Sequence, residues 1–427
     1  MKKMLSVFIV LFMIAPLTAG AEELVKKDET LDLQRCIAIA VKRQPNILAA
    51  LNTVRVNESR VGQAKANYYP QVNLSAGYSK NYTGSSSSVY GSNSPYNDYS
   101  SSVTLSQNIY DFDKTSTQVK IQNLNRDSSQ QDMANVTSQI VFSVKQTYYA
   151  LLQAMKNRDV AIETVRQFQH HLEQAKGFFE VGIKPKFDVT KAEVDLSNAK
   201  LNLLTAENNV KLARVNLNNA IGLPEAPPFS IEDNLAFQPY EIPFEEALKK
   251  AYAGRPDLQS LLLKKASQEK TIDLAKKGYY PYLTGNASYG YEGQSFPVDK
   301  GWAVGATLNV PIFSGLSTKY QVEEAQASLA VLKANEETLR QSIYLDVQQA
   351  WLNLQVAKDK ISTAELSVRQ ANENLDLANG RYAAGVGNPI EVTDSLVAQS
   401  NSKTAHVGAL YDYRIAQASI EKAMGVK

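Results

Sequence analysis

The sequence predicts a mixed α/β membrane protein, built as two copies of one unit, with strands in the membrane and long helices outside it. Three observations predict this fold class. A shift of 211 positions places residues 33–78 on residues 244–289 with 11 identities in 46 positions. Four short runs alternate apolar and polar side chains, as half-buried strands do. Two stretches of some 70 residues contain no proline, the residue that breaks helices.

The first 21 residues have the pattern of a cleaved secretory signal. Lys2 and Lys3 precede an apolar run over residues 4–17, and small residues end at Ala21. The run is too short for a spanning helix, which needs about 20 residues. Residue 22 is glutamate and not cysteine, which argues against a lipid-anchored start. We therefore expect residues 1–21 to be removed from an exported chain.

Composition excludes several functional classes. The 427 residues include 45 basic and 43 acidic side chains, which gives no basic field for nucleic acid. The only cysteine, Cys36, can form no internal disulfide, and we expect it to be a buried thiol. The three histidines form no HExxH pair, and the chain has no Walker A, GxSxG or CxxC motif. We therefore expect that the protein is not an enzyme and that it has no cofactor and no metal site.

The repeat divides the chain into domains. Residues 22–224 form the first copy, residues 225–241 a proline-containing linker, and residues 242–427 the second copy. From Leu105 onward the offset falls to 203, because the first copy has a longer Ser-rich segment at residues 84–102. A repeat of about 200 residues indicates a duplicated domain, since solenoid repeats are only 20 to 50 residues long.

Each copy begins with an amphipathic helix, predicted over residues 33–69 and 244–280, before a proline. Two strands follow in each copy, and each is about ten residues long. The four predicted strands are residues 72–82, 99–109, 283–292 and 302–310. A tilted strand needs about 9 to 11 residues to cross a bilayer, so these lengths fit.

Charge distinguishes membrane strands from a soluble pair of hairpins, which is the alternative. Residues 71–110 and 281–313 hold five charged side chains among 73 residues, about 7%, against 21% for the chain. Tyrosines gather in the same segments, as in the aromatic girdles of membrane barrels. Four strands cannot close a barrel, so we expect an oligomer. Two copies give eight strands and three give twelve, and a conduit needs the larger number.

The proline-free stretches, residues 111–181 and 314–384, predict helices of about 105 Å at 1.5 Å per residue. Each then meets a glycine, and a return helix begins near Pro185 or Pro389. The first return helix has a heptad seam with alanine at every second position. This seam consists of Val189, Ala192, Leu196, Ala199, Leu203, Ala206, Val210, Ala213, Leu217 and Ala220. The equivalent seam of the second copy, which starts at Val392, is more polar.

Four segments, in this order within a duplicated chain, carry a family resemblance. They are Tyr68-Tyr69-Pro70, Tyr279-Tyr280-Pro281, the LNVPIFSG run at residues 308–315 and the RYAAG run at residues 381–385. The chain resembles the outer membrane efflux (TolC) proteins over nearly its whole mature length. The resemblance implies a homotrimer with a 12-stranded β-barrel in outer membrane lipid and a long periplasmic α-helical barrel, in a Gram-negative bacterium.

The resemblance also implies partners and a transport role. Family members dock to a periplasmic membrane-fusion adaptor protein and an inner membrane pump of RND or ABC type. The chain would then be the passive outer membrane channel of a tripartite efflux or type I secretion system, for small molecules or proteins. The alternative is a surface structural protein or adhesin, whose binding element would be the Ser/Tyr-rich loop at residues 84–99. The long helices after the strands favour the conduit.

The family's functional residues map onto two places in this sequence. The two helix turns, which adaptors grasp, are Val181, Gly182, Ile183, Ala384, Gly385 and Val386. Their glycines also have a simpler explanation, since glycine commonly ends helices. The channel gate maps to Glu391 and Asp394, with Asp188 as the first-copy counterpart of Glu391.

The gate residues have a simpler explanation too. Asn388, Pro389 and Glu391 fit a helix N-cap, first position and capping box, and acids favour helix N-termini. Some family members carry an arginine two residues after the second turn glycine, able to pair with such an acid. Here that position is Gly387, so this particular link is not expected.

Overall fold

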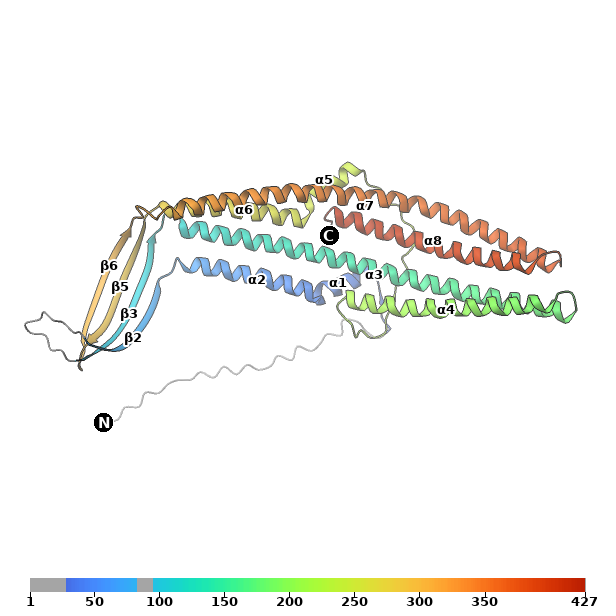
Figure 1. Ribbon diagram of the computed structural model, residues 1–427, viewed down its shortest axis with the longest axis horizontal. Helices are drawn as coiled ribbons and strands as arrows, with labels where there is room; N and C mark the ends of the chain where they lie inside the picture. The colour runs from blue at the N-terminus through green and yellow to red at the C-terminus, as the bar shows by residue number, and fades with distance from the viewer. Residues whose placement is uncertain (1–27, 83–94, 427) are drawn as a thin grey trace, which may run out of the picture.

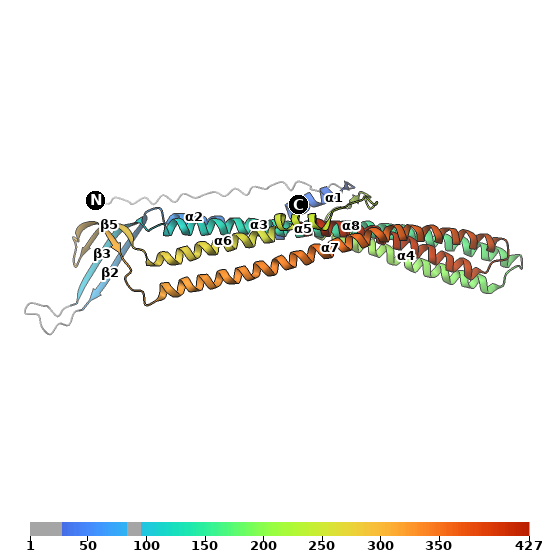
Figure 2. The same cartoon turned by 90° about the horizontal axis from the view of Figure 1, so that it is seen from above.

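The molecule is long and narrow, with a β-sheet at one end and helices over the rest of its length (Figures 1 and 2). The structure is a computed structural model that describes residues 28–82 and 95–426. The predicted signal, residues 1–21, and most of the Ser/Tyr-rich loop lie outside the described residues. None of the helices in the described ranges is both long and apolar enough to cross a membrane.

The same order of elements occurs in both halves of the chain. The first half contains β1 (Thr30–Leu31), α1 (Leu33–Arg43), α2 (Pro45–Ala66), β2 (Gln71–Asn81), β3 (Tyr96–Tyr110), α3 (Lys114–Glu180) and α4 (Lys186–Ala220). The second half contains β4 (Ser230–Ile231), α5 (Phe244–Gly254), α6 (Pro256–Lys276), a 3-10 turn (Lys277–Tyr279), β5 (Tyr282–Gly293), β6 (Asp299–Asn309), α7 (Ser317–Ala383) and α8 (Pro389–Ala423). The predicted strands, long helices and return helices are confirmed within a few residues.

The prediction of one continuous first helix in each half is wrong. Residues 33–66 form α1 and α2, separated at Gln44, and residues 244–276 form α5 and α6, separated at Arg255. Gln44 and Arg255 are extended, with ψ near 121° and 122°. Each precedes a proline, whose ring clashes with a helical conformation of the residue before it. The proline therefore ends one helix and begins the next.

These breaks allow short helices to stack end to end. The Gln44 side-chain amide donates 2.9 Å hydrogen bonds to the carbonyls of Asn219 and Ala220, which satisfies the end of α4 at the start of α2. Gly425, with φ of +71°, ends α8 against the junction between α5 and α6. A Cβ atom there would lie 2.7 Å from the backbone carbon of Gly254, so only glycine fits. The α2–α4 and α6–α8 stacks run beside α3 and α7 (Figure 1).

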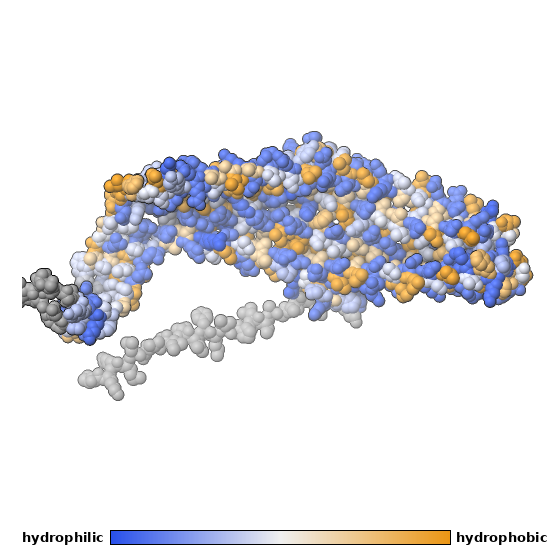
Figure 3. Space-filling view, in the orientation of Figure 1, coloured by the Kyte–Doolittle hydropathy of each residue, from blue (hydrophilic) through white to orange (hydrophobic). Residues whose placement is uncertain are grey.

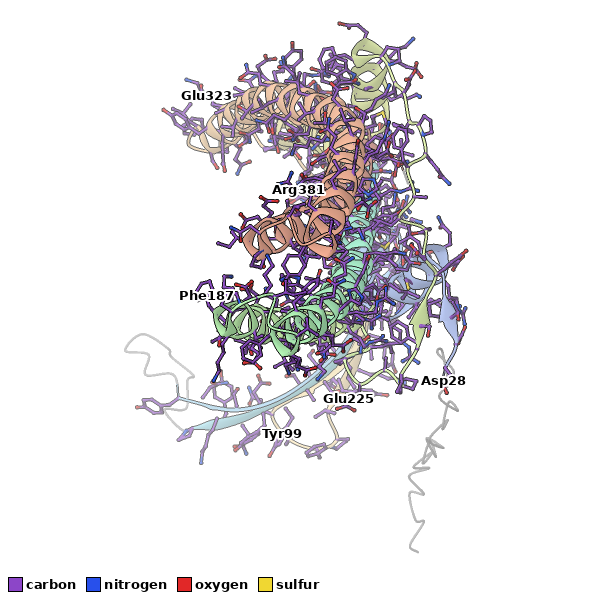
Figure 4. All side chains as sticks on the ribbon, turned by 90° about the vertical axis from the view of Figure 1, so that its right-hand side faces the viewer. Asp28, Tyr99, Phe187, Glu225, Glu323 and Arg381 are labelled. Carbon is purple, nitrogen blue, oxygen red and sulfur yellow. The ribbon has the colours of Figure 1, made fainter. Side chains whose placement is uncertain are left out.

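α3 and α7 have 67 residues each, which corresponds to about 100 Å of helix. Near the sheet the helices pack in the row α2–α3–α6–α7, and at the far end in the row α4–α3–α8–α7. Viewed from the far end, the row forms an open curve (Figure 4). α4 and α7 therefore stand at the two edges of the curve.

The four long strands form one antiparallel sheet in the order β2-β3-β5-β6. Residues directly opposite each other lie on the same face. One such row is Val72, Leu105, Ala287 and Val304, and the next on that face is Leu74, Val103, Tyr289 and Trp302. The row between them, on the other face, is Asn73, Thr104, Ser288 and Ala303. The predicted alternation is therefore confirmed in these central rows, where one face of the sheet is apolar and the other is mostly polar.

Aromatic and aliphatic side chains are also exposed where the sheet meets the helices (Figure 3). They include Tyr68, Tyr69, Tyr110, Tyr279, Tyr280, Ile312 and Phe313. Ile312 is 94% exposed and Phe313 81% exposed, which is unusual for large apolar residues in water. This belt has the composition of a membrane interface girdle.

The buried core lies between the helices. The predicted seam of α4 is confirmed, since every one of its ten positions is buried or half-buried. Cys36 is fully buried in α1 against α3, and burial raises the pKa of its thiol to about 12. The prediction of a buried thiol is confirmed.

Candidate functional site

The end of the molecule farthest from the sheet consists of two helical hairpins, α3–α4 and α7–α8 (Figure 1). Both long helices end in the same way. Gly182 and Gly385 have φ of +75° and +77°, a left-handed conformation that favours glycine. The amides after them, Ile183 and Val386, donate back to the carbonyls of Phe178 and Arg381. This is the Schellman ending of a helix, so both glycines have the helix-ending role.

The six residues predicted to dock an adaptor are exposed at this tip. Val386 is 73% exposed, Val181 68% and Ile183 59%. The two turns are held together, because the Lys184 ammonium donates a 3.1 Å hydrogen bond to the carbonyl of Gly387. The tip therefore presents one small apolar surface made from both hairpins.

Below this surface, apolar side chains from all four helices form the tip core. Its buried members are Phe168, Leu172, Ala175, Ala192, Leu196, Ala199, Leu375, Ala378, Tyr382, Val392 and Leu396. Tyr382 is fully buried at its centre and touches Phe178 edge-to-face, with ring centroids 5.4 Å apart. Lys184 lies 5.5 Å from the centroid of the Tyr382 ring, on the side of the turns.

The two predicted gate acids on α8 point away from this core. Glu391 and Asp394 are exposed, whereas Val392 and Thr393 between them are buried. The two acids are three residues apart and therefore share one face of the helix. Glu391 pairs with Arg381 of the same chain, at 3.2 Å between Nε and Oε2. Asp394 has no ion pair within the described residues.

Asp188, the sequence counterpart of Glu391, lies in a different environment. It is 6% exposed and faces the tip core, where its charge acts on His171 and Tyr382. The two halves therefore do not present equivalent acids. Sequence alignment could not show this, because burial at this point depends on how the hairpins pack against each other.

The helix-capping explanation of this segment is partly confirmed. The Asn388 side chain accepts a 3.0 Å hydrogen bond from the Ile390 amide, and Pro389 occupies the first position of α8. Glu391, however, binds Arg381 and does not complete a capping box. At Gly387 a Cβ atom would lie 2.7 Å from the Tyr382 nitrogen, so the backbone conformation leaves no space for a larger residue.

Sequence reasoning missed a polar link between α4 and α8. The Asp195 carboxylate accepts hydrogen bonds from Lys191 Nζ, at 2.7 and 2.8 Å, and from Thr393 Oγ1, at 3.0 Å. Asp195 is 9% exposed. The spacing of four residues between Lys191 and Asp195 is typical of an ion pair on one helix and can be read from the sequence. Thr393, however, lies 198 positions from Asp195 in the chain, so this contact cannot. Lys184, His171 and Tyr382 were likewise not predicted to meet.

Comparison with known proteins identifies the family. A family model described as outer membrane efflux protein matches residues 36–223 and 247–426. The chain belongs to the outer membrane efflux protein family. Outer membrane protein TolC of Escherichia coli (strain K12) is 25% identical over 388 residues, which cover 86% of this chain and 76% of TolC. Protein CyaE of Bordetella pertussis (strain Tohama I) is 25% identical over 387 residues, which cover 87% of this chain and 79% of CyaE.

The fold is shared with solved outer membrane channels. The crystal structure of the Campylobacter jejuni CmeC outer membrane channel superimposes with a TM-score of 0.79 at 19% identity, covering 92% of this chain and 85% of CmeC. Members of the family are channel proteins of the Gram-negative outer membrane with a periplasmic extension. The chain is accordingly an outer membrane efflux protein, and its tip is the periplasmic end. This outcome favours the conduit over the adhesin.

Proposed function

We propose that three copies of the chain form a passive conduit, a 12-stranded barrel in the outer membrane continued by a periplasmic helical tunnel. The observation that carries this proposal is the open sheet. β2 and β6 are edge strands of eleven residues each, with no strand beyond them in the described chain. Unpaired backbone groups cost several kcal/mol each in lipid, so a membrane sheet must close.

The strand directions allow closure by identical copies. Neighbouring strands in the sheet are antiparallel, and the number of strands is even. β6 of one copy can therefore pair in the antiparallel sense with β2 of the next. Three copies supply twelve strands, with the apolar rows facing lipid and the serine, threonine and asparagine rows lining a pore.

The helices support the same arrangement. α4, at one edge of the helix curve, exposes apolar residues at multiples of seven: Phe187, Val194, Leu201 and Val215. α7, at the other edge, does so with Val331, Leu345, Leu352 and Leu366. Heptad spacing is the pattern of a coiled-coil seam, and these residues are about half exposed or more in a single copy. We infer that α4 of one copy packs beside α7 of the next.

In the trimer, Glu391 and Asp394 would each occur three times around the axis near the tip. We propose that these acids form carboxylate rings at the channel gate, with Asp188 held in the core behind them. The exposed turn residues would dock a periplasmic membrane-fusion adaptor, which connects the channel to an inner membrane pump of RND or ABC type. The chain would serve a tripartite efflux or type I secretion system and export small molecules or proteins.

We also propose that residues 22–224 and 242–427 arose as two copies of one unit. The repeated element order, the equal lengths of α3 and α7, and the 35 residues of both α4 and α8 support this. Leu31 pairs with Ile231 in a short parallel ladder, so part of the linker at residues 225–241 lies against the first copy.

The test is to purify the mature chain in detergent, measure its mass, and record its conductance in a planar bilayer. A trimer with small, stable currents that prefer cations is the expected result. A monomer that carries no current would contradict the conduit, because the sheet edges would then remain open.

A further inference from the structure

A histidine lies inside the tip core. His171 on α3 is 3% exposed, and its Nδ1 atom has no hydrogen-bond partner among the described residues. The hydroxyl of Tyr382, whose ring contacts the His171 ring, is also buried and lacks a partner among those residues. The two ring centroids are 5.2 Å apart. Two adjacent side chains thus keep buried polar atoms unsatisfied, which is costly for the packed state.

These two residues come from different hairpins. His171 belongs to the α3–α4 hairpin, and Tyr382 is near the end of α7 in the α7–α8 hairpin. Their contact therefore crosses the interface between the two hairpins. If the hairpins separate, water can reach the Nδ1 atom of His171 and the hydroxyl of Tyr382.

The charged groups around His171 act in both directions. From α4, Asp188 and Asp195 favour the imidazolium and Lys191 opposes it; from α3, His170 opposes it. From α7 the facing group is Tyr382, itself buried, and the core residues of α8, Val392 and Leu396, are apolar. Asp195 already binds Lys191 and Thr393. Burial is the largest effect, and it lowers the pKa of His171 below its ordinary value.

We propose that His171 is a proton-sensitive switch, which couples acidification to separation of the two hairpins at the periplasmic tip. The switch rests on the proposed role of the tip as the gated end of a conduit. The direction follows from linkage. In the packed tip the imidazole is neutral, whereas in the separated tip it is hydrated and takes up a proton near pH 6.5. As the pH falls below that value, the separated state binds more protons and its population rises, by at most tenfold per pH unit and per chain.

The first test compares two adjacent histidines. His171→Gln keeps a polar side chain but cannot be protonated, and His170→Gln is the control because His170 is exposed on the same helix turn. Open probability in planar bilayers should rise for the parent channel between pH 7.5 and 5.5, and His170→Gln should retain that rise. His171→Gln should abolish it. A full acid response in His171→Gln would overturn the switch.

Hydrogen exchange tests the switch without requiring conduction. Amide hydrogen exchange is measured in the parent protein and in His171→Gln at each pH. Amides of residues 168–199 and 371–396 should lose protection in acid in the parent protein but not in His171→Gln. Equal protection in the parent and in His171→Gln at every pH would overturn the switch. An acid-dependent difference in a protein that carries no current would support the switch and contradict the conduit alone.

A measurement on the unmutated protein covers the case in which His171→Gln fails to fold. The chain has three histidines, so selective isotope labelling gives three imidazole signals. His170→Gln and His406→Gln assign two of them, and the third belongs to His171. The His171 signal should titrate below pH 6.5 in the trimer. A His171 signal that titrates at or above pH 6.5 would overturn the switch.

Discussion

The ammonium of Lys184, in the turn between α3 and α4, donates its hydrogen bond to the Gly387 carbonyl in the turn between α7 and α8. The two residues are 203 positions apart in the chain. Position 387 is a glycine and carries no side-chain donor, but its carbonyl accepts a hydrogen bond from a lysine of the other turn. The link joins the two hairpins within one copy.

Lys184→Met should therefore loosen the tip while retaining most of the apolar side-chain length. A hydrogen bond from a charged donor contributes about 1.5–3 kcal/mol when buried, and this one is only partly buried, so we expect a loss of about 1 kcal/mol. Longer channel openings should accompany it. Lys186→Met, two residues further on at an exposed site, is the matched control. Equal opening times in the two variants would show that the link has no role in holding the tip closed.

Gly387→Ala should destabilise the second turn, because its Cβ atom would overlap the backbone of Arg381 and Tyr382 at 2.8 and 2.7 Å. Gly380→Ala, seven residues earlier in the last turn of α7, has nothing within 4 Å of the new methyl and should stabilise the helix by about 0.5–1 kcal/mol. Thermal unfolding of the trimer distinguishes them. A melting temperature for Gly387→Ala at or above that of Gly380→Ala would contradict the geometry of the turn.

Neutralising the two gate acids should have unequal effects on ion selectivity. Arg381 already compensates much of the Glu391 charge, whereas Asp394 has no such partner in the described chain. Asp394→Asn should reduce the cation preference more than Glu391→Gln, and the double change to alanine should raise single-channel conductance. Reversal potentials in a salt gradient measure the preference. Unchanged selectivity and conductance in the double variant would show that neither acid contributes to the gate.

Contact between neighbouring copies can be tested on α4. Leu201→Glu places a charge in the proposed contact between α4 of one copy and α7 of the next. It removes an apolar contribution of about 1.5–3 kcal/mol to the free energy of association at each of three interfaces. It should shift the purified protein from trimer to monomer in native mass spectrometry. Asn202→Glu adds a charge at an exposed position about 100° around the helix and should leave the trimer intact. A trimer that tolerates Leu201→Glu would place the contact elsewhere.

Cys36 offers a probe of folding. Because the thiol is fully buried and burial raises its pKa to about 12, it should not react with maleimide at pH 7.5 in the native protein. It should react fully in denaturant. Rapid labelling of the native trimer would mean that α1 does not pack against α3 as described.

The long-range features of the fold could be predicted from local signals. The absence of proline determined where α3 and α7 run, and strand alternation determined which face of the sheet is apolar. The proline effect also favours the breaks at Gln44 and Arg255, whereas the amphipathic pattern across them predicts one helix. Local signals were sufficient wherever the residues that decide the structure are neighbours in sequence.

The tip required tertiary structure. His171 meets Tyr382, Lys184 meets Gly387, and Asp195 meets Thr393 only because the two hairpins pack together. No periodicity connects residues about 200 positions apart. For the same reason the sequence counterparts Asp188 and Glu391 could not be distinguished as buried and exposed.

We propose that the open sheet closes through identical copies to form a conduit. Conductance recorded from the purified mature chain in a planar bilayer, together with its mass in detergent, tests this closure. A trimer with small, stable, cation-preferring currents is the expected result. A chain that remains a monomer and carries no current would contradict it.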